Sequence, residues 1–209
     1  LRRRADAVLR TAMSEAAGAA PDIPITGEVL DGTPAAVLLR ESRTAALIVV
    51  GHRGLRALSG LLVGSVAVQV SAQARCPVLV TLGDRPRETG AVVVGVAGTA
   101  RSDPAVGFAF AEAALRGAEL VALHAGNRLP AAPVATWRER FPQVAVTPRL
   151  APGRPAPALI DESARAQLVV TGSVGRGGFT GLVRGSVSHA VLRDSRCPLA
   201  IVRRDGPAA

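Results

Sequence analysis

An internal duplication is the feature of this sequence that most restricts its fold. When the sequence is shifted by 121 residues, positions 32–80 align without a gap on positions 153–201, and 20 of the 49 aligned residues are identical. Solenoid repeats are much shorter, roughly 20 to 50 residues, so each copy should be a domain. We predict a first copy over residues 1–82, a linker over 83–90 and a second copy over 91–209.

The second copy alternates apolar strand segments with helical segments. The run AVVVGVAG at 91–98 is typical of a strand buried on both faces. The helical segment after it ends at Gly117, a residue type that commonly follows a helix. Five strands joined by helices require parallel pairing and a doubly wound open sheet, for which we assume the order 3-2-1-4-5. The predicted strands are 91–98, 119–126, 144–150, 166–172 and 197–204, and the predicted helices are 103–117, 132–141, 157–165 and 186–196.

The first copy begins late in comparison with the second. Leu1 aligns with the second helix of the domain, so two strands and the helix between them have no counterpart in the first copy. Those strands would form the middle of the sheet, which leaves the strand expected at 24–30 without a neighbour. Position 1 is not methionine, and we expect the sequence to be a piece of a longer chain.

A glycine loop with the spacing G-x2-G-x9-G-S occurs once in each copy, directly after a predicted strand and before a predicted helix. The first loop contains Gly51, Gly54, Gly64 and Ser65, and the second contains Gly172, Gly175, Gly185 and Ser186. In open α/β sheets, ligands bind in the crevice outside the carboxyl ends of the strands, where these loops begin. The unpaired amides of a helix N-terminus attract anions. We interpret each loop as a phosphate-binding element. In the first loop, Gly51 and Gly54 can take positive φ angles and bring the backbone close to a ligand.

Arginines in both loops are candidates for additional positive charge toward a phosphate. They are Arg53 and Arg56 in the first loop and Arg176 and Arg184 in the second. A purely structural role of the glycines, in close strand–helix packing, is the alternative interpretation.

The composition excludes several classes of chemistry. All 25 basic residues are arginine, so neither a Walker A loop nor a Schiff-base lysine is available. The formal charge of +9 is spread over both copies, and the chain has one tryptophan and no tyrosine. Base-stacking platforms are therefore scarce, and nucleic-acid binding is not favoured. No apolar run is long enough to span a bilayer, and we expect a cytoplasmic protein.

The two cysteines and the three histidines do not form a recognisable site. Cys76 and Cys197 have no partner at metal-ligand spacing and are expected to be buried apolar residues. We expect His124 to be structural, with its polar tip at the crevice, and we give His52 and His189 no catalytic role. Trp137 and Phe141 are expected in the core, whereas Arg203 and Arg204 are expected in a solvated tail.

These motifs together resemble the universal stress protein family, in its tandem-domain form. The resemblance rests on the glycine loop after the fourth strand, on VVGVAGT in the first strand and on LHA at the end of the second. It implies the adenine-nucleotide α-hydrolase-like fold and a bound adenine nucleotide, ATP with or without Mg²⁺. It also implies that the last strands of the two domains pair antiparallel within the chain, which would keep Cys76 and Cys197 too far apart for a disulfide. A homodimer is a further option.

The resemblance implies specific nucleotide contacts. In the second copy they are Gly95, Val96, Ala97, Ala125, Thr171, Gly172, Gly175, Gly185, Ser186 and Val187, and in the first they are Val50, Gly51, Gly54, Gly64, Ser65 and Val66. Ala97 stands where the family pattern has an aspartate that holds the ribose. We therefore expect the stronger site in the first copy, with the help of upstream residues.

The expected function is that of a non-catalytic nucleotide-responsive module. One alternative is a nucleotide-independent interaction protein whose glycine loops are structural. Another is an ATP-hydrolysing enzyme, although no Ser-His-Asp set or carboxylate pair repeats in both copies.

Overall fold

The structure is a computed structural model that describes residues 2–52, 64–81, 89–97, 103–128, 130–172 and 186–203. The chain forms two compact units, Leu1–Val37 and Leu38–Ala209. The first unit contains helix α1 (Arg2–Ala19) and the first turn of α2 (Pro34–Glu41). The second unit contains the rest of α2 and the elements that follow it, among them the sheet.

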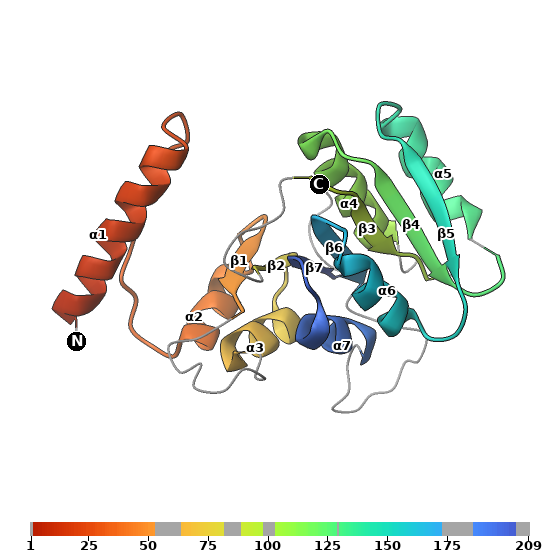
Figure 1. The fold of residues 1–209 in the computed structure, drawn as a ribbon. Helices are drawn as coiled ribbons and strands as arrows, with labels where there is room; N and C mark the ends of the chain where they lie inside the picture. The colour runs from red at the N-terminus through yellow and green to blue at the C-terminus, as the bar shows by residue number, and fades with distance from the viewer. Residues whose placement is uncertain are drawn as a thin grey trace. The chain divides into compact units, whose positions relative to one another are not determined.

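Within the described residues, the second unit contains a seven-stranded sheet of order β1-β2-β7-β6-β3-β4-β5 (Figure 1). The strands are β1 (Ile48–Gly51), β2 (Val78–Thr81), β3 (Val92–Gly95), β4 (Leu120–Ala125), β5 (Val146–Ala151), β6 (Leu168–Gly172) and β7 (Leu199–Val202). The helices of this unit are α3 (Ser65–Gln73), α4 (Asp103–Arg116), α5 (Ala131–Arg140), α6 (Pro155–Ser163) and α7 (Ser186–Asp194), with the end of α2.

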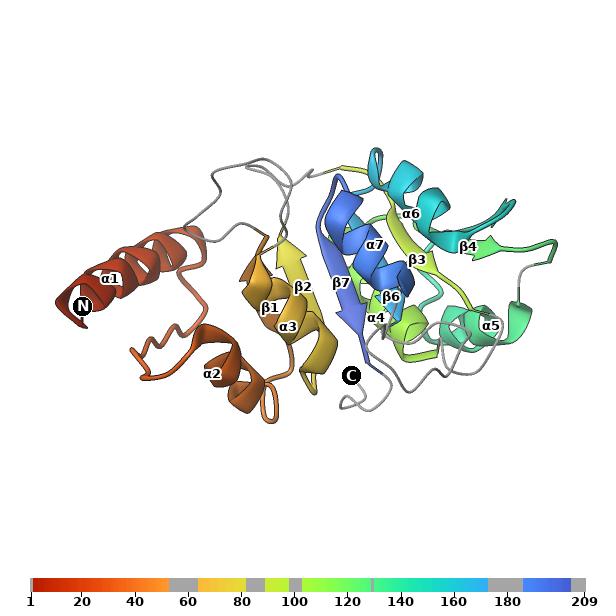
Figure 2. The same ribbon diagram turned by 90° about the horizontal axis from the view of Figure 1, so that it is seen from below.

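The second copy has the predicted doubly wound topology. Its five strands are all parallel and lie in the order β5-β4-β3-β6-β7, which is 3-2-1-4-5 in the numbering of one domain. Helices α4 and α5 cover one face of these strands, and α6 and α7 cover the other (Figures 1 and 2). The predicted fold class is therefore confirmed. The division into copies at 83–90 does not coincide with the two compact units and stays a prediction.

The two copies join through their last strands. β2 and β7 pair antiparallel, with Val78 opposite Ile201 and Val80 opposite Leu199. β1 runs parallel to β2, and β6 runs parallel to β7. Consequently β1 and β6 run in opposite directions, and their carboxyl ends lie at opposite edges of the sheet.

The strand predicted at 24–30 does not form. The structure describes residues 20–33 and assigns no strand to them. A strand is stabilised by hydrogen bonds to a neighbouring strand, and none of the described strands pairs with this segment. The apolar pattern alone was therefore a poor guide at this position.

The core of the second copy lies between the sheet and α4. Phe110 of α4 is fully buried together with Leu120 and Leu168 of the strands. The ring of Phe141 lies 6.0 Å from that of Phe110 and 6.2 Å from that of Trp137, measured between centroids. Both Trp137 and Phe141 pack against this cluster, so their expected place in the core is confirmed.

Helix α4 ends as the sequence predicts. Gly117 has a φ angle of +57°, a conformation that costs glycine little. The amide of Ala118 donates to the carbonyl of Ala113 at 2.9 Å, and the amide of Gly117 donates to that of Ala114 at 3.3 Å. These two bonds form a Schellman motif.

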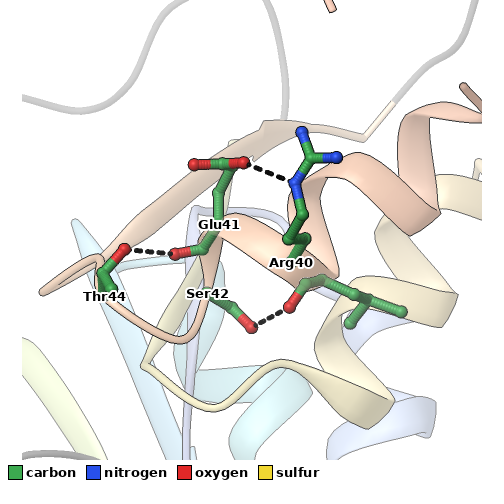
Figure 3. Close-up of polar contacts among 5 residues, drawn as sticks. Arg40, Glu41, Ser42 and Thr44 are labelled. Carbon is green, nitrogen blue, oxygen red and sulfur yellow. Dashed lines mark hydrogen bonds and ion pairs between the residues drawn. The ribbon is translucent and has the colours of Figure 1, made fainter. Parts of the chain in front are cut away.

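A buried serine plays the same structural part in each copy. The hydroxyl of Ser42 donates to the carbonyl of Leu39 at 2.7 Å (Figure 3) and accepts the amide of Arg75 at 3.1 Å. In the second copy Ser163 donates to Ile160 at 2.6 Å and accepts the amide of Arg196 at 2.9 Å. Each serine therefore ties the end of one helix to the loop before the last strand.

Replacing either serine by alanine should destabilise the protein. In Ser42→Ala the amide of Arg75 loses its acceptor, and an unsatisfied group of this kind costs about 1–3 kcal/mol. Urea unfolding followed by circular dichroism measures the effect. Thr136→Ala, on an exposed face of α5, is the matched control and should change stability by less than about 0.5 kcal/mol. Equal stability of Ser42→Ala and the control would contradict the assigned role.

Gly107 allows Trp137 to pack directly on the backbone of α4. A Cβ atom at position 107 would lie 2.3 Å from Cζ2 of Trp137. Gly107→Ala should therefore lower stability by about 1–3 kcal/mol through overpacking, although alanine alone favours a helix by up to about 1 kcal/mol. In this variant the wavelength of maximum fluorescence emission of Trp137, the single tryptophan, should shift. Trp137→Leu should relieve the clash, and a stabilised Gly107→Ala protein with unchanged fluorescence would refute the packing argument.

Candidate functional site

The second copy has a topological switch point between β3 and β6. The chain leaves β3 toward β4 on one side and leaves β6 toward β7 on the other, although β3 and β6 are parallel neighbours. Connections that diverge in this way open a crevice outside the carboxyl ends of the two strands. The ends in question are Gly95 of β3 and Gly172 of β6.

Several residues predicted from the sequence meet at this edge. Gly95 and Val96 end and follow β3, Thr171 and Gly172 end β6, and Ala125 ends β4, the next strand. Ala97 follows Val96. Ser186 is the first residue of α7, and Val187 is the second. The remaining predicted residues of the second loop, Gly175 and Gly185, lie outside the described residues, as do Arg176 and Arg184.

Thr171 has an unusual environment for a polar side chain. It is 3% exposed, and its hydroxyl has no hydrogen-bond partner among the described residues. A buried hydroxyl without a partner costs free energy. Its counterpart in the first copy is Val50, which needs no partner. A ligand that fills the crevice is one means of satisfying the hydroxyl of Thr171.

The loop of the first copy begins at the end of β1. Val50 and Gly51 are the last residues of this strand, and Gly51 pairs with Thr81 of β2. Positive φ angles occur, among the described glycines, at positions 32, 90, 117 and 153. Gly51 therefore does not use the positive φ that a glycine can adopt, because the residue still belongs to the extended strand. Gly54, Arg53 and Arg56 lie outside the described residues.

Helix α3 offers amide groups at the other end of this loop. Gly64 is its N-cap residue, with φ −57° and ψ 133°, and makes no side-chain cap. The amide of Gly64 itself donates to the carbonyl of His52 at 3.0 Å, so this group is not open to an anion. The amides of Ser65, Val66 and Ala67 have no acceptor among the described residues. The amides in this part of the loop that are still open to an anion are therefore those of the residues after Gly64.

The two copies differ in the strands that lie beside the start of each glycine loop. β6 has β3 as its second neighbour, whereas β1 pairs with β2 alone among the described strands. Val49 of β1 is 55% exposed, but Val170, its counterpart in β6, is fully buried. Because β1 and β6 end at opposite edges of the sheet, the two glycine loops cannot share one ligand.

Comparison with known proteins identifies the family to which this chain belongs. The family model described as "Universal stress protein family" matches residues 1–81 and 127–203. The chain belongs to the universal stress protein family. Universal stress protein Rv2005c of Mycobacterium tuberculosis is 37% identical over 214 residues, which cover 91% of this chain and 72% of that protein. Universal stress protein Rv1996 of the same organism is 38% identical over 218 residues, covering 90% and 68%.

A solved structure supports the fold of the family member described here. A universal stress protein from Archaeoglobus fulgidus aligns with a TM-score of 0.75 over 97% of this chain and 79% of that chain, at 24% sequence identity. The likeness at this level of identity concerns the fold.

His124 of this universal stress protein lies one residue before the end of β4, at the edge of the sheet where β3 and β6 also end. The side chain is 9% exposed, and its Nδ1 lies 2.7 Å from the carbonyl oxygen of Val96. His189 is exposed on α7, whereas His52 lies in the loop after β1. The sequence predicts a structural His124 at this edge, but it does not reveal the bond to Val96, which links two strands.

Arg203 corrects one expectation from the sequence. We expected it in a solvated tail, but it is half-buried, and its Nη1 donates to the carbonyl of Ala72 at 2.6 Å. Ala72 lies in the last turn of α3, where a cation interacts favourably with the helix dipole. The residue therefore connects the second copy to the first. Arg204 lies outside the described residues.

The remaining polar groups do not indicate metal chemistry in the described ranges. Cys76 and Cys197 are buried thiols, and burial raises the pKa of the Cys76 thiol. No group of three or more His, Cys, Asp or Glu side chains in the described part of the chain is placed to hold a metal ion. Across the same part, none of the helices combines the length and apolar content needed to cross a bilayer.

The environment of Thr171 leads to a test. Thr171→Val removes a buried hydroxyl without a partner, so we expect stability to be unchanged or raised by up to about 1–2 kcal/mol. Thr81→Val is the matched control, because the hydroxyl of Thr81 donates to the carbonyl of Val50 at 3.5 Å. Thermal unfolding without ligand measures both. A loss of stability in Thr171→Val larger than that in Thr81→Val would show that the hydroxyl is satisfied within the protein.

Proposed function

We propose that this universal stress protein is a non-catalytic module that binds an adenine nucleotide, with ATP as the ligand, and responds to the state of the cell by a ligand-selected conformation. The observation that carries the proposal is the repeated glycine loop. In both copies the loop follows the carboxyl end of a parallel strand and precedes a helix N-terminus, the arrangement at which phosphates bind.

The geometry of each copy supports a different part of the proposal. In the first, α3 presents the amides of Ser65, Val66 and Ala67, which have no acceptor among the described residues. In the second, Thr171 brings a buried hydroxyl without a partner in those residues to the end of β6. An oxyanion bound at either place accepts hydrogen bonds from these donor groups. Charge-assisted hydrogen bonds of this kind, in particular those from backbone amides, are strong.

The proposal includes binding without turnover. The chain contains no lysine to neutralise charge on a transferred phosphoryl group, as the P-loop lysine does.

Ala97 lacks a carboxylate to hold ribose hydroxyls, which removes bonds of about 1.5–3 kcal/mol from the second site. We therefore propose that the first site is the stronger one in the full-length protein, and that the protein acts in the cytoplasm.

A proline substitution tests the phosphate contact without breaking the helix. Ser65 is the first residue of α3, a position that tolerates proline, and the ψ angle of 133° at Gly64 suits a residue before proline. Ser65→Pro therefore removes one amide donor and the hydroxyl, whereas Ser65→Ala removes the hydroxyl alone. Ser186→Pro and Ser186→Ala form the same pair at α7.

We expect the proline variants to bind ATP about ten- to hundredfold more weakly than their alanine controls, the equivalent of one charge-assisted bond. Isothermal titration calorimetry of the full-length protein measures each site. Affinity equal in the proline and alanine variants would reject phosphate binding by these amides. If ATP neither binds nor raises the melting temperature, the nucleotide-independent interaction protein becomes the better description, and phosphate release above background would reject binding without turnover.

A further inference from the structure

We propose that His124 is a specificity-determining residue of the crevice in the second copy, and that its Nε2 accepts a hydrogen bond from an N–H or O–H group of the ligand. The inference rests on the proposed function of this crevice and adds a direct contact that selects the ligand. It assigns a binding role to a side chain that the sequence predicts to be structural.

The first step is the position of the ring. Nδ1 lies 2.7 Å from the carbonyl oxygen of Val96, the residue that follows β3. At the other end of the ring, a Cβ atom added to Gly126, the residue that follows β4, would lie 2.6 Å from Nε2. The imidazole thus extends across the carboxyl ends of two neighbouring parallel strands. This is the edge at which the crevice opens.

The second step is the protonation of the ring. A carbonyl oxygen can only accept a hydrogen bond, so Nδ1 must carry the proton in the bond to Val96. In a neutral imidazole with its proton on Nδ1, Nε2 is left with a lone pair and is an acceptor only. The backbone of β3 therefore fixes the tautomer, and with it the type of group that Nε2 can bind.

The third step is the access of a ligand to Nε2, which is not among the buried side-chain atoms that lack a partner in the described residues and therefore reaches solvent. His124 is 9% exposed, and the bond to Val96 is the hydrogen bond that the described residues provide to its ring. An acceptor held in such a place discriminates strongly, because a ligand without a matching donor leaves it unpaired. Gly126 has no side chain to cover Nε2, and a larger residue there would collide with the ring.

An adenine nucleotide carries two kinds of donor that fit this acceptor, the exocyclic amine of the base and the hydroxyls of the ribose. Three analogues of ATP each lack one of these donor groups. Inosine triphosphate replaces the exocyclic amine by a carbonyl oxygen, whereas 2′-deoxy-ATP and 3′-deoxy-ATP each lack one hydroxyl. We predict that one of the three analogues binds more weakly than ATP, because it lacks the donor group that bonds to Nε2 of His124.

The test is a cycle that combines protein variants with ligand analogues. The four nucleotides are titrated by calorimetry into the full chain carrying Ser65→Pro, which weakens the first site, with His124 intact or replaced in His124→Phe. We expect the protein with His124 to bind ATP about two- to tenfold more tightly than one of the analogues, the effect of one neutral hydrogen bond. His124→Phe should bind ATP and that analogue equally.

A structural role of His124 predicts a different pattern. Loss of the bond to Val96 would weaken ATP and all three analogues by the same factor and leave their ratios unchanged, and this outcome would overturn the inference while ATP binding itself stands. His124→Gln is a second variant in case His124→Phe does not fold, because its amide can still donate to Val96. It should change the order of preference among the analogues, and an unchanged order would again overturn the inference. Absence of nucleotide binding by the protein with His124 would instead reject the proposed function, and the inference with it.

Discussion

The antiparallel pair formed by β2 and β7 is the interaction on which the rest of the second unit depends. Only this pair joins strands of the two copies among the described residues, with Val78 opposite Ile201 and Val80 opposite Leu199. Backbone hydrogen bonds fix its register, and the buried side chains of both strands add apolar area that favours the contact. Arg203 strengthens the junction with its bond to the last turn of α3.

The direction of this pair also determines how the two glycine loops can act. An antiparallel junction reverses the second copy relative to the first, so β1 and β6 end at opposite edges of the sheet. The two glycine loops therefore begin at opposite edges of the sheet, beside strands that differ in the described residues. β6 is flanked on both sides and contributes a buried Thr171, whereas β1 is an edge strand with an exposed Val49.

The positions of several candidate site residues in the fold were predictable because their elements obey local rules. Buried parallel strands read as continuous apolar runs, which placed Gly95, Thr171 and Gly172 at strand ends. Gly117 closes α4 for a local reason as well, since the Schellman motif needs a positive φ. Prediction failed at 24–30, where an apolar pattern met no neighbouring strand. It failed again at Arg203, because a chain terminus gives no local sign that a helix from the other copy lies beside it.

The sequence by itself determined that this universal stress protein contains a duplicated α/β module with a glycine loop in each copy. Periodicity, helix-ending glycine and repeat spacing are properties of neighbouring residues, which act through local sterics and burial. Only the tertiary structure decided that the amide of Gly64 is used by His52, that Thr171 lies without a partner among the described residues, and that His124 is bonded to Val96. These contacts join residues brought together by strand order and register, which depend on the packing of the whole sheet rather than on any one segment.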